Sequence, residues 1–260
     1  MSGRPWLAVL SLTVLAAWTS LSQAAPVWLG RFAEASPATP AAPPPPWQVV
    51  RLNPKVAPTH YQTRLWDGVA AIEARADASM ALLTRPLELD LSATPVLCWR
   101  WRVQRVLHGA DITTKQGDDY AARVYVAFSV ASDAMSLATR GKLALGRALY
   151  GDQVPDAALN YVWDNRSPVG TRRANAYTDR TQMIVQRSGA ELAGQWVVER
   201  VNVLADAIQT FGTDRLRAVL LAVAADTDNT GEQAHSGFAD LHLVGPHAPC
   251  EFPAAAVAPR

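Results

Sequence analysis

The sequence has little of several features that would reveal a function directly. Its 260 residues include only 2 cysteines and carry a formal net charge of +1. A balanced charge gives no sign of nucleic-acid binding and argues against a polybasic membrane tether. No cysteine directly follows the N-terminal apolar run, which argues against a lipoprotein anchor, and no known catalytic signature is present. What remains is a chain with 49% hydrophobic residues, which is enough for one sizeable core.

The first 24 residues are typical of a secretory signal peptide. Arg4 supplies the positive end, residues 6–18 form the apolar run, and residues 22–24 offer a small-residue cleavage site. The run is shorter than the roughly 20 residues that a spanning helix needs. We therefore expect a periplasmic or secreted mature chain that begins at Ala25 and has no stable membrane span. A single membrane anchor is the alternative.

Two terminal stretches are predicted to lie outside the folded domain. Residues 25–46 include ASPATPAAPPPP, which cannot bury enough apolar surface to fold, so we predict a disordered spacer rich in Pro and Ala. Residues 246–260 are again rich in Pro and Ala and are predicted to form a loose tail. The folded domain is therefore expected over residues 47–245.

The domain shows the pattern of many short strands. From Trp47 onward, apolar segments are separated by turn residues such as Asp67-Gly68, and later segments include QWVVERVNVLAD from Gln195. One helical insertion is expected to begin at Ser132 or Asp133, where apolar residues recur at helical spacing. This pattern predicts a mainly β fold, an antiparallel β-sandwich of jelly-roll type with one short helical insertion.

Two strong strands lie at the centre of the sequence, CWRWRV from Cys98 and ARVYVAFSV ending at Val130. Strict alternation places Trp99 and Trp101 on the core side of the first strand. If the two strands are neighbours, the polar residues of their opposite faces share one surface: Arg100, Arg102, Arg123 and Tyr125. This surface is either an ordinary solvated face or a recognition face, on which arginine side chains bind carboxylates or sugar hydroxyls.

The segment AADTDNTGE concentrates oxygen-bearing side chains at the end of an apolar strand. Ca²⁺ prefers about six to eight oxygen ligands, and the segment lacks the spacing and flanking helices of an EF-hand. A Ca²⁺ site is therefore weighed against a turn in which Asp and Asn side chains bond nearby backbone. The candidate metal ligands are Asp226, Asp228, Asn229 and Asp240.

Aromatic residues beside acids and amides suggest a sugar-binding surface. Aromatic rings stack on the apolar faces of pyranoses, while amides and charges bind the hydroxyl groups. For most of the 9 tryptophans, packing in the core is the alternative role. The candidate ligand-binding residues are Arg100, Arg102, Asp118, Asp119, Arg123, Tyr125, Trp163, Glu199 and Asn202.

An enzyme that uses the same face is the alternative to a binding module. Glycoside hydrolysis needs two carboxyl groups across a cleft, and the candidates are Asp119, Glu199, Asp226 and Asp240. A uronate lyase needs a base beside groups that neutralise the carboxylate, and the candidates are Arg123, Tyr125, Asn202 and His242. Neither chemistry has a sequence signature, so no catalytic residue is assigned and a non-catalytic module is favoured.

The two cysteines lie far apart in the sequence, Cys98 in a strand and Cys250 in the tail. Either they form one disulfide that ties the tail to the sheet, or Cys98 is a buried free thiol. The 5 histidines show no pattern that supports a Cys–His nucleophile.

Six sequence blocks occur in an order that is typical of one family. They are PTHY from Pro58, CWRWRV from Cys98, GDDYAARVYVAF from Gly117, NYVWDN from Asn160, QWVVERVN from Gln195 and DTDNTGE from Asp226. Together they resemble the bacterial domain-of-unknown-function family numbered 3047, over Trp47 to Val244. The resemblance implies an exported β-sandwich and implies no established activity, substrate or catalytic residue.

These observations lead to one preferred hypothesis and two alternatives. The preferred hypothesis is an exported binding module for a glycan or another anionic envelope ligand, with Ca²⁺ as a candidate stabilising ion. The first alternative is a polysaccharide-active enzyme, either a lyase or a glycoside hydrolase. The second is a scaffold in an envelope complex.

Overall fold

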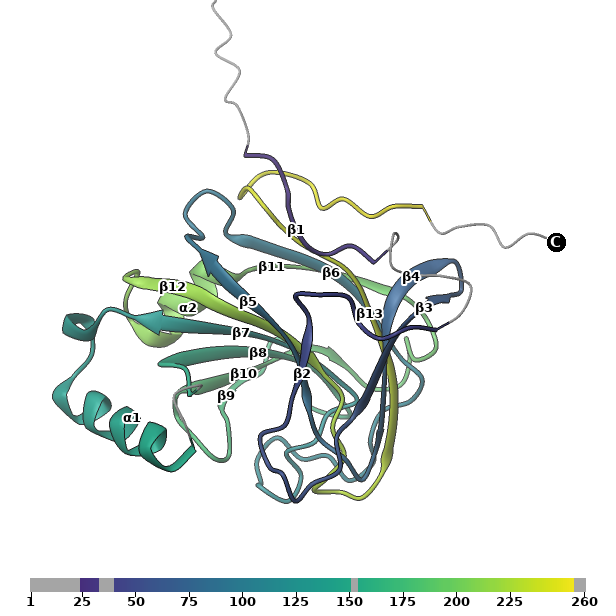
Figure 1. Cartoon of the computed structure of the whole chain (residues 1–260), viewed down its shortest axis with the longest axis horizontal. Coiled ribbons are helices and arrows are strands. Elements are labelled where there is room, and N and C mark those ends of the chain that lie inside the picture. The colour runs from purple at the N-terminus through teal and green to yellow at the C-terminus, as the bar shows by residue number, and fades with distance from the viewer. Residues whose placement is uncertain (1–23, 33–39, 151–153, 255–260) are drawn as a thin grey trace, which may run out of the picture.

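The structure, a computed structural model, describes residues 24–32, 40–150 and 154–254 (Figure 1). The predicted signal peptide over residues 1–24 lies outside these ranges, apart from Ala24. Within the described residues, no helix is both long enough and apolar enough to cross a membrane.

The chain forms two β-sheets, as the sequence pattern predicted. The first sheet has the strand order β11 (Val197–Asn202), β6 (Val96–Val103), β13 (Gln233–Val244), β4 (Val69–Asp77) and β3 (His60–Trp66), with β1 (Val27–Gly30) also paired to β13. The second has the order β2 (Gln48–Val50), β5 (Leu82–Leu89), β12 (Leu216–Ala224), β7 (Ala122–Val130), β8 (Ala157–Asp164), β10 (Thr181–Ser188) and β9 (Arg172–Ala174). Among these strands the pairing of β10 with β8 is parallel. The fold is therefore mainly β and is consistent with a β-sandwich.

The core lies between the two sheets and follows the predicted alternation. Trp99 and Trp101 in β6 are fully buried, and their rings pack against Tyr161 and Trp163 of β8 in the opposite sheet. The centroid distances are 5.7 Å for Trp99 with Tyr161 and 5.6 Å for Trp101 with Trp163. Large aromatic side chains at such distances gain from both burial and ring geometry. These contacts join the sheets.

Two helices are present in the described residues, where one was expected. α1 (Leu137–Tyr150) confirms the predicted insertion, but the Ser136 hydroxyl caps it by accepting from the Thr139 amide, later than predicted. α2 (Val203–Phe211) replaces the second half of a predicted strand. The Asn202 side chain ends β11 by accepting from the Ala205 amide and capping α2. Apolar residues four positions apart in α2 then face the sandwich, which is why helix replaces strand there.

The described parts of the predicted spacer are ordered, so the prediction of a disordered spacer is wrong for them. β1 pairs with β13, and Trp28 lies opposite His242 in the register. Phe32 is buried, and the backbone of Ala41 exchanges hydrogen bonds with Thr63. The physical reason is that the segment carries large apolar side chains between Pro26 and its later prolines, and their burial against the sheet offsets the entropy of ordering.

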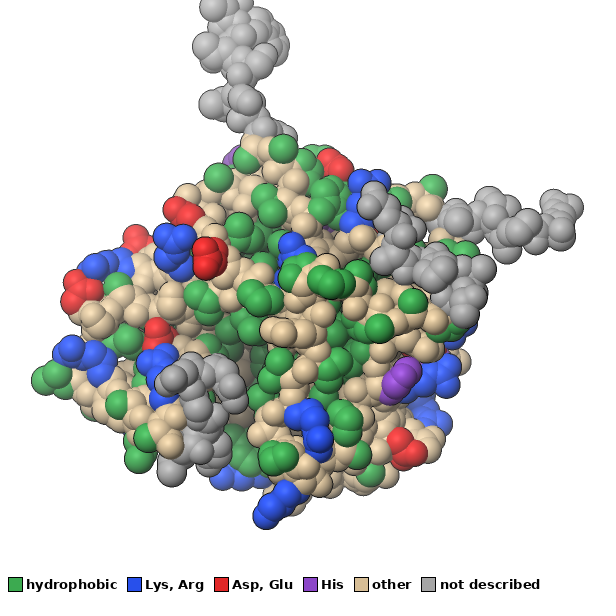
Figure 2. Space-filling view, in the orientation of Figure 1, with side chains coloured by type: hydrophobic (Ala, Val, Ile, Leu, Met, Phe, Trp, Pro, Cys, Tyr) green, Lys and Arg blue, Asp and Glu red, His purple; other side chains and the backbone are tan. Residues whose placement is uncertain are grey.

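Figure 2 shows hydrophobic side chains along the middle of one face, with charged side chains of both signs around its rim. In Figure 1 the β2 segment crosses the front of the molecule in this region. Val49 in β2 and the nearby Leu52 are about half exposed. This face therefore presents apolar side chains, and the charges around it are not predominantly of one sign.

Candidate functional site

The four polar residues expected on one surface lie on two. β6 belongs to the first sheet and β7 to the second, so the strands are not neighbours. Arg100 and Arg102 lie on the outer face of the first sheet, whereas Arg123 and Tyr125 lie on the outer face of the second. The expectation of one shared surface is wrong because the loop between the strands crosses the sandwich.

Several predicted residues do meet at one end of the sandwich, and we call them the acidic loop cluster. It joins the loop before β7 to the loop between β12 and β13, although these loops are more than one hundred residues apart in sequence. Its members are Asp118, Asp119, Arg123, Asp226, Asp228 and Asn229. The structure thus brings together the acid pair, one arginine of the predicted face and the predicted calcium segment.

Hydrogen bonds within this cluster occupy its two most buried carboxylates. Asp119 is fully buried and accepts from the Thr230 amide and from both the backbone and side-chain amides of Asn229. Asp226 is 2% exposed and forms an ion pair with Arg123, whose Nε donates at 2.7 Å. The cluster therefore fastens the two loops to each other and to β7.

Electrostatics in the cluster disfavour further negative charge. Burial raises the pKa of Asp118, although nearby Arg123 counteracts this. Burial, together with the neighbouring Asp119, also raises the pKa of Asp228. The guanidinium of Arg123 supplies positive charge to these carboxylates. Its further hydrogen bonds, at 2.9 Å to the Tyr125 hydroxyl and at 3.0 Å to the Asp118 carbonyl, fix its position.

The predicted calcium ligands meet only in part. Asp119, Asp226 and Asp228 have carboxylate oxygens within 4.8 Å of one another. Asp240 is not among them, because it lies on the first sheet and forms an ion pair with Arg100. The backbone and side-chain N–H groups of Asn229 donate to Asp119, so the side-chain nitrogen faces that carboxylate. A calcium ion here stays a prediction, with the carboxylates of Asp119, Asp226 and Asp228 as its candidate ligands.

Three other predicted ligand-binding residues do not share a surface, and each makes contacts that stabilise the fold. Trp163 is buried in the core and its indole donates to the Gly189 carbonyl. Glu199 is buried, accepts from the Trp101 indole and pairs with Arg187. Asn202 caps α2. Of the predicted hydrolase carboxylates, Asp119 and Asp226 meet, whereas Glu199 and Asp240 lie elsewhere. Of the predicted lyase residues, Arg123 and Tyr125 meet, whereas Asn202 and His242 lie elsewhere.

A cleft that sequence reasoning missed lies on the outer face of the first sheet, and we call it the arginine cleft. Its volume is about 410 Å³. It lies where β4 ends and β13 begins, beside the end of β6. Its polar lining residues are Arg75, Asp77, Gln104, Arg105, Gln233 and His235, and two alanines complete the lining. The lining carries more positive than negative charge.

Glu73 lies beside this cleft and organises the charged groups around it. Its side chain is fully buried and accepts from Arg64 Nη1 at 2.8 Å and from Arg75 Nη2 at 3.0 Å. The Gln62 amide also donates to it, and His235 Nε2 lies 2.6 Å from its Oε1. Four groups from three neighbouring strands therefore converge on one carboxylate.

An aromatic pad continues the surface toward the hairpin between β3 and β4. The Trp66 ring stacks on His235 with centroids 4.4 Å apart, and Trp196 meets Trp66 edge to face. The Arg102 guanidinium lies 4.3 Å from the Trp66 centroid. A Cβ atom at Gly237 would lie 2.7 Å from the Trp196 ring, so the glycine lets this ring lie against the sheet. Arg102 is the one predicted residue that belongs to this surface.

Acid is expected to weaken the domain through Glu73. Burial raises its pKa, but hydrogen bonds from Arg75, Gln62, His235 and Arg64 outweigh burial and lower the pKa to about 2, from an ordinary 4.5. Because the folded-state pKa is depressed, the stabilisation is present above pH 4.5 and is lost as the pH falls toward 2. At neutral pH it amounts to about 3 kcal/mol.

Thermal unfolding against pH tests this expectation. A Glu73→Gln variant should melt lower than wild type at neutral pH and should lose less stability across the acid window. Asp133→Asn is the matched control, because that carboxylate is exposed and its ion pair with Arg215 lies elsewhere on the surface. Parallel curves for wild type and Glu73→Gln would contradict the assignment.

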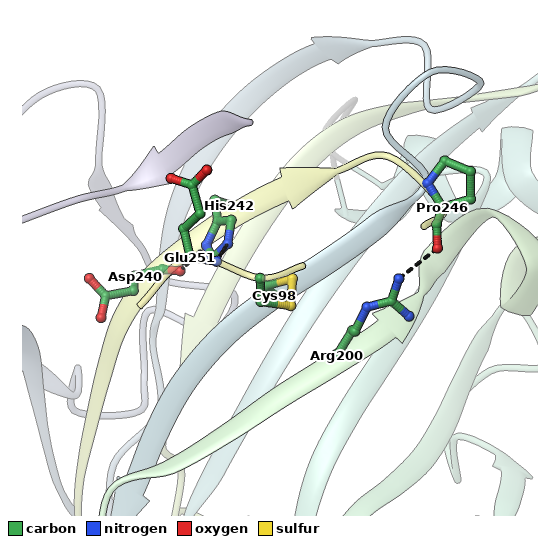
Figure 3. The surroundings of a disulfide bond; sticks show 7 residues. Cys98, Arg200, Asp240, His242, Pro246 and Glu251 are labelled. Carbon is green, nitrogen blue, oxygen red and sulfur yellow. Dashed lines mark hydrogen bonds between the residues drawn. A yellow bond between two sulfur atoms is a disulfide. The ribbon is translucent and has the colours of Figure 1, made fainter. Parts of the chain in front are cut away.

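The far end of the first sheet is closed by the C-terminal tail (Figure 3). Cys98 and Cys250 form a disulfide, and Arg200 donates to the Pro246 carbonyl at 2.6 Å. The prediction of a loose tail is therefore wrong for residues 246–254; residues 255–260 lie outside the described ranges. Of the two alternatives for the cysteines, the disulfide that ties the tail to the sheet is therefore the one observed, and Cys98 is not a free thiol.

His242 lies beneath this tail and cannot serve as a catalytic base. It is fully buried, stacks on Trp28 with centroids 4.5 Å apart, and has contacts at both ring nitrogens. Nδ1 lies 2.6 Å from the Asp240 carbonyl, and the Glu251 amide donates to Nε2 at 2.9 Å. Burial lowers its pKa, so the ring stays neutral at neutral pH. This histidine is part of the tail anchor.

The sequence contains one local pattern that could have indicated the arginine cleft. It contains no pattern that indicates the contact of His235 with Glu73. Gln62 with Arg64, and Glu73 with Arg75, are polar pairs two residues apart in adjacent segments. This spacing puts each pair on one face of a hairpin. His235 follows about 160 residues later, and only the pairing of β13 with β4 places it opposite Arg75.

Comparison with known proteins gives a family and no activity. No curated protein matches the chain. The sequence model of the family described as "Protein of unknown function (DUF3047)" matches residues 45–242. That range begins just before β2 and ends within β13, so it contains both helices and every strand except β1 and the end of β13. Since the match covers more than half of the sequence, the chain belongs to the DUF3047 family.

Proposed function

We propose that this domain is an exported, periplasmic or secreted module that binds an acidic glycan or another anionic envelope ligand at the arginine cleft. The single observation that carries the proposal is this cleft of about 410 Å³, lined by Arg75 and Arg105 with one acidic residue, Asp77. Concave sites with a few convergent polar groups are the usual places where small ligands bind.

The chemistry of the lining supports an anionic sugar. Arginine side chains bind carboxylates through paired N–H donors, and both cleft arginines are largely exposed. Gln104 and Gln233 offer amides of the kind that bind sugar hydroxyls. Glu73 repels an anion little, because Arg64 and Arg75 neutralise its charge. Of the aromatic pad beside the cleft, Trp66 is buried and the Trp196 ring is half-buried.

We further infer a jelly-roll topology for the sandwich. The chain alternates between the sheets from β4 to β7 and again from β11 to β13, with β4, β6, β11 and β13 in the first sheet and β5, β7 and β12 in the second. The neighbour order is β6, β13, β4 in the first sheet and β5, β12, β7 in the second. This interleaving of early and late strands supports two nested Greek keys.

A structural Ca²⁺ is the second part of the proposal. It would lie among the carboxylates of Asp119, Asp226 and Asp228 in the acidic loop cluster. Hard cations prefer such oxygen ligands. Arg123 already forms an ion pair with Asp226. A calcium ion would therefore either displace the guanidinium from this carboxylate or bind beside it. The unfolding experiment in the Discussion separates these cases.

A binding measurement on the folded domain tests the glycan proposal. Polygalacturonate and a neutral glucan serve as probes, measured by calorimetry at low and at raised salt. We expect binding of the acidic polymer alone, weakened by salt, and a loss of at least 10-fold in affinity for Arg75→Ala with Arg105→Ala. A loss of this size follows when charge-assisted hydrogen bonds worth about 1.5–3 kcal/mol each are removed.

The matched control removes two arginines far from the cleft. Arg140 in α1 and Arg173 in β9 are exposed, so their double replacement by alanine changes the net charge equally. Equal loss in both double variants would mean nonspecific charge attraction and would contradict the cleft. Capture of an envelope protein without dependence on glycan would instead support the scaffold alternative.

A further inference from the structure

A base in the lining of the arginine cleft, His235, contacts a buried carboxylate beside the cleft, Glu73, in an arrangement that binding alone does not require. Glu73 stays ionised, so its carboxylate can only accept hydrogen bonds. The contact of 2.6 Å to His235 therefore requires the proton to be on Nε2. In the neutral ring, the lone pair then lies on Nδ1, and no described group bonds to Nδ1. The free nitrogen belongs to a residue that lines the cleft.

The surroundings hold this imidazole in one orientation. Trp66 stacks on the ring with an interplanar angle of 23°, and Glu73 is itself held by Gln62 and Arg64. Burial lowers the pKa of His235, although Glu73 counteracts this. The ring is therefore neutral at neutral pH and can accept a proton. A carboxylate that orients a histidine is a recurrent arrangement in general-base catalysis.

We propose that the domain cleaves 4-linked uronate polymers by β-elimination, with His235 as the catalytic base and Glu73 as its positioning residue. This inference rests on the proposed binding of an acidic glycan and goes beyond it. Arg75 and Arg105 would neutralise the uronate carboxylate, which makes the proton on the adjacent carbon more acidic. The same groups that give affinity thereby lower the barrier to proton removal.

The reaction balances with the groups present. His235 Nδ1 takes the proton from C5 of the uronate, and the electron pair of that C–H bond forms the C4=C5 double bond. The C4–O bond breaks, and its electron pair leaves with the glycosidic oxygen. The imidazolium then gives its proton to that oxygen, which leaves the chain as a hydroxyl group. The base returns to its neutral form, and no other reactant is consumed.

The experiment measures binding and cleavage separately on the purified protein. Polygalacturonate and polymannuronate are incubated with wild type, and the unsaturated product is followed by its ultraviolet absorbance. We expect unsaturated ends with wild type. His235→Asn should lower the rate about 100-fold or more, as expected when a general base is lost. Its affinity for the polymer should stay within a few-fold of wild type.

The positioning role of Glu73 is read from the pH profile. The charged groups that face His235 are Glu73, Arg75 and Asp77 from β4, Arg64 from β3, and Arg105. Glu73→Gln removes a negative charge, so the imidazolium becomes less stable and the acidic limb of the rate profile should move to lower pH. A merely structural role would lower the rate without moving this limb.

Each outcome separates the two proposals. Binding without any unsaturated product from either polymer would overturn the lyase and leave the binding module intact. Cleavage by His235→Asn at the wild-type rate would also overturn it, and His235→Gln repeats this test if the first variant is unfolded. Absence of binding to both polymers would defeat the proposed function itself. Arg140→Ala, far from the cleft, should cleave at the wild-type rate.

Discussion

Replacement of Arg123 by alanine is expected to lower the melting temperature by on the order of 10 °C. Arg123 is 2% exposed and neutralises Asp226, which is equally buried. Its removal leaves an unpaired buried carboxylate, and breaking such a pair costs about 3–5 kcal/mol. In a domain of this size each kcal/mol shifts the midpoint by about 2–4 °C. Thermal unfolding of the two proteins measures the difference.

The control for this variant is an exposed ion pair. Arg215 pairs with Asp133, and both side chains are more than half exposed. Arg215→Ala should therefore cost less than about 1 kcal/mol. Equal losses in Arg123→Ala and Arg215→Ala would contradict the view that burial decides the cost. Replacing Arg123 and Asp226 together by leucine should restore part of the stability, because no uncompensated charge then remains.

The same melts decide the calcium proposal. Wild type, Asp228→Asn and Arg123→Ala are unfolded with chelator and then with added Ca²⁺. A rise in the wild-type midpoint that Asp228→Asn abolishes would support an ion among Asp119, Asp226 and Asp228. A rise only in Arg123→Ala would mean that the guanidinium normally takes the place of the ion. Unchanged midpoints in all three would reject calcium.

Loss of the disulfide is the second large effect that we expect. The bond joins residues 152 positions apart, so it restricts the unfolded chain over most of its length. Chain-entropy reasoning for a loop of this length gives about 5 kcal/mol, and removal of native disulfides typically costs about 2–5 kcal/mol. Cys250→Ser should therefore unfold at a clearly lower denaturant concentration than oxidised wild type, with a steeper slope, because the unfolded chain without the crosslink exposes more surface.

The experiment distinguishes the covalent bond from the contacts of the tail. Reduced wild type and Cys98→Ser with Cys250→Ser should unfold at the same denaturant concentration as Cys250→Ser alone. The tail also makes noncovalent contacts, since Arg100 donates to the Pro253 carbonyl and Glu251 donates to His242. A truncation after Val244 should therefore cost more than the serine variant. Equal stability of oxidised wild type and Cys250→Ser would contradict the expected entropic effect.

Local patterns predicted the strands and much of the core. Alternation in β6 and β7 correctly placed Trp99, Trp101, Val124 and Val126 inside, because side-chain direction depends only on the positions of successive residues in one strand. The insertion at α1 was also predicted from a local pattern, the helical spacing of its apolar residues. The helix α2 was missed because Val and Ile in a short segment fit both a strand and a helix.

The site depended on contacts between distant segments. Asp119 and Asn229 were each predicted as site residues, but the sequence contains no sign that they touch. Arg100 and Arg123 were predicted to share a surface, and the sheet order separates them. Glu73 and His235 were not predicted at all, although their contact holds the histidine that lines the arginine cleft. In each case, the pairing and packing of distant segments determines whether the two residues meet.

Local patterns in the sequence predict the mainly β class, the residues that alternate into the core and the resemblance to the DUF3047 family. These properties follow from local period and from blocks of residues in order. Three contacts follow from the folded chain and not from any local pattern: Cys98 with Cys250, Arg123 with Asp226, and His235 with Glu73. The physical reason is that strand pairing joins segments far apart in the chain, and its order is set by packing of the whole domain and not by any local pattern.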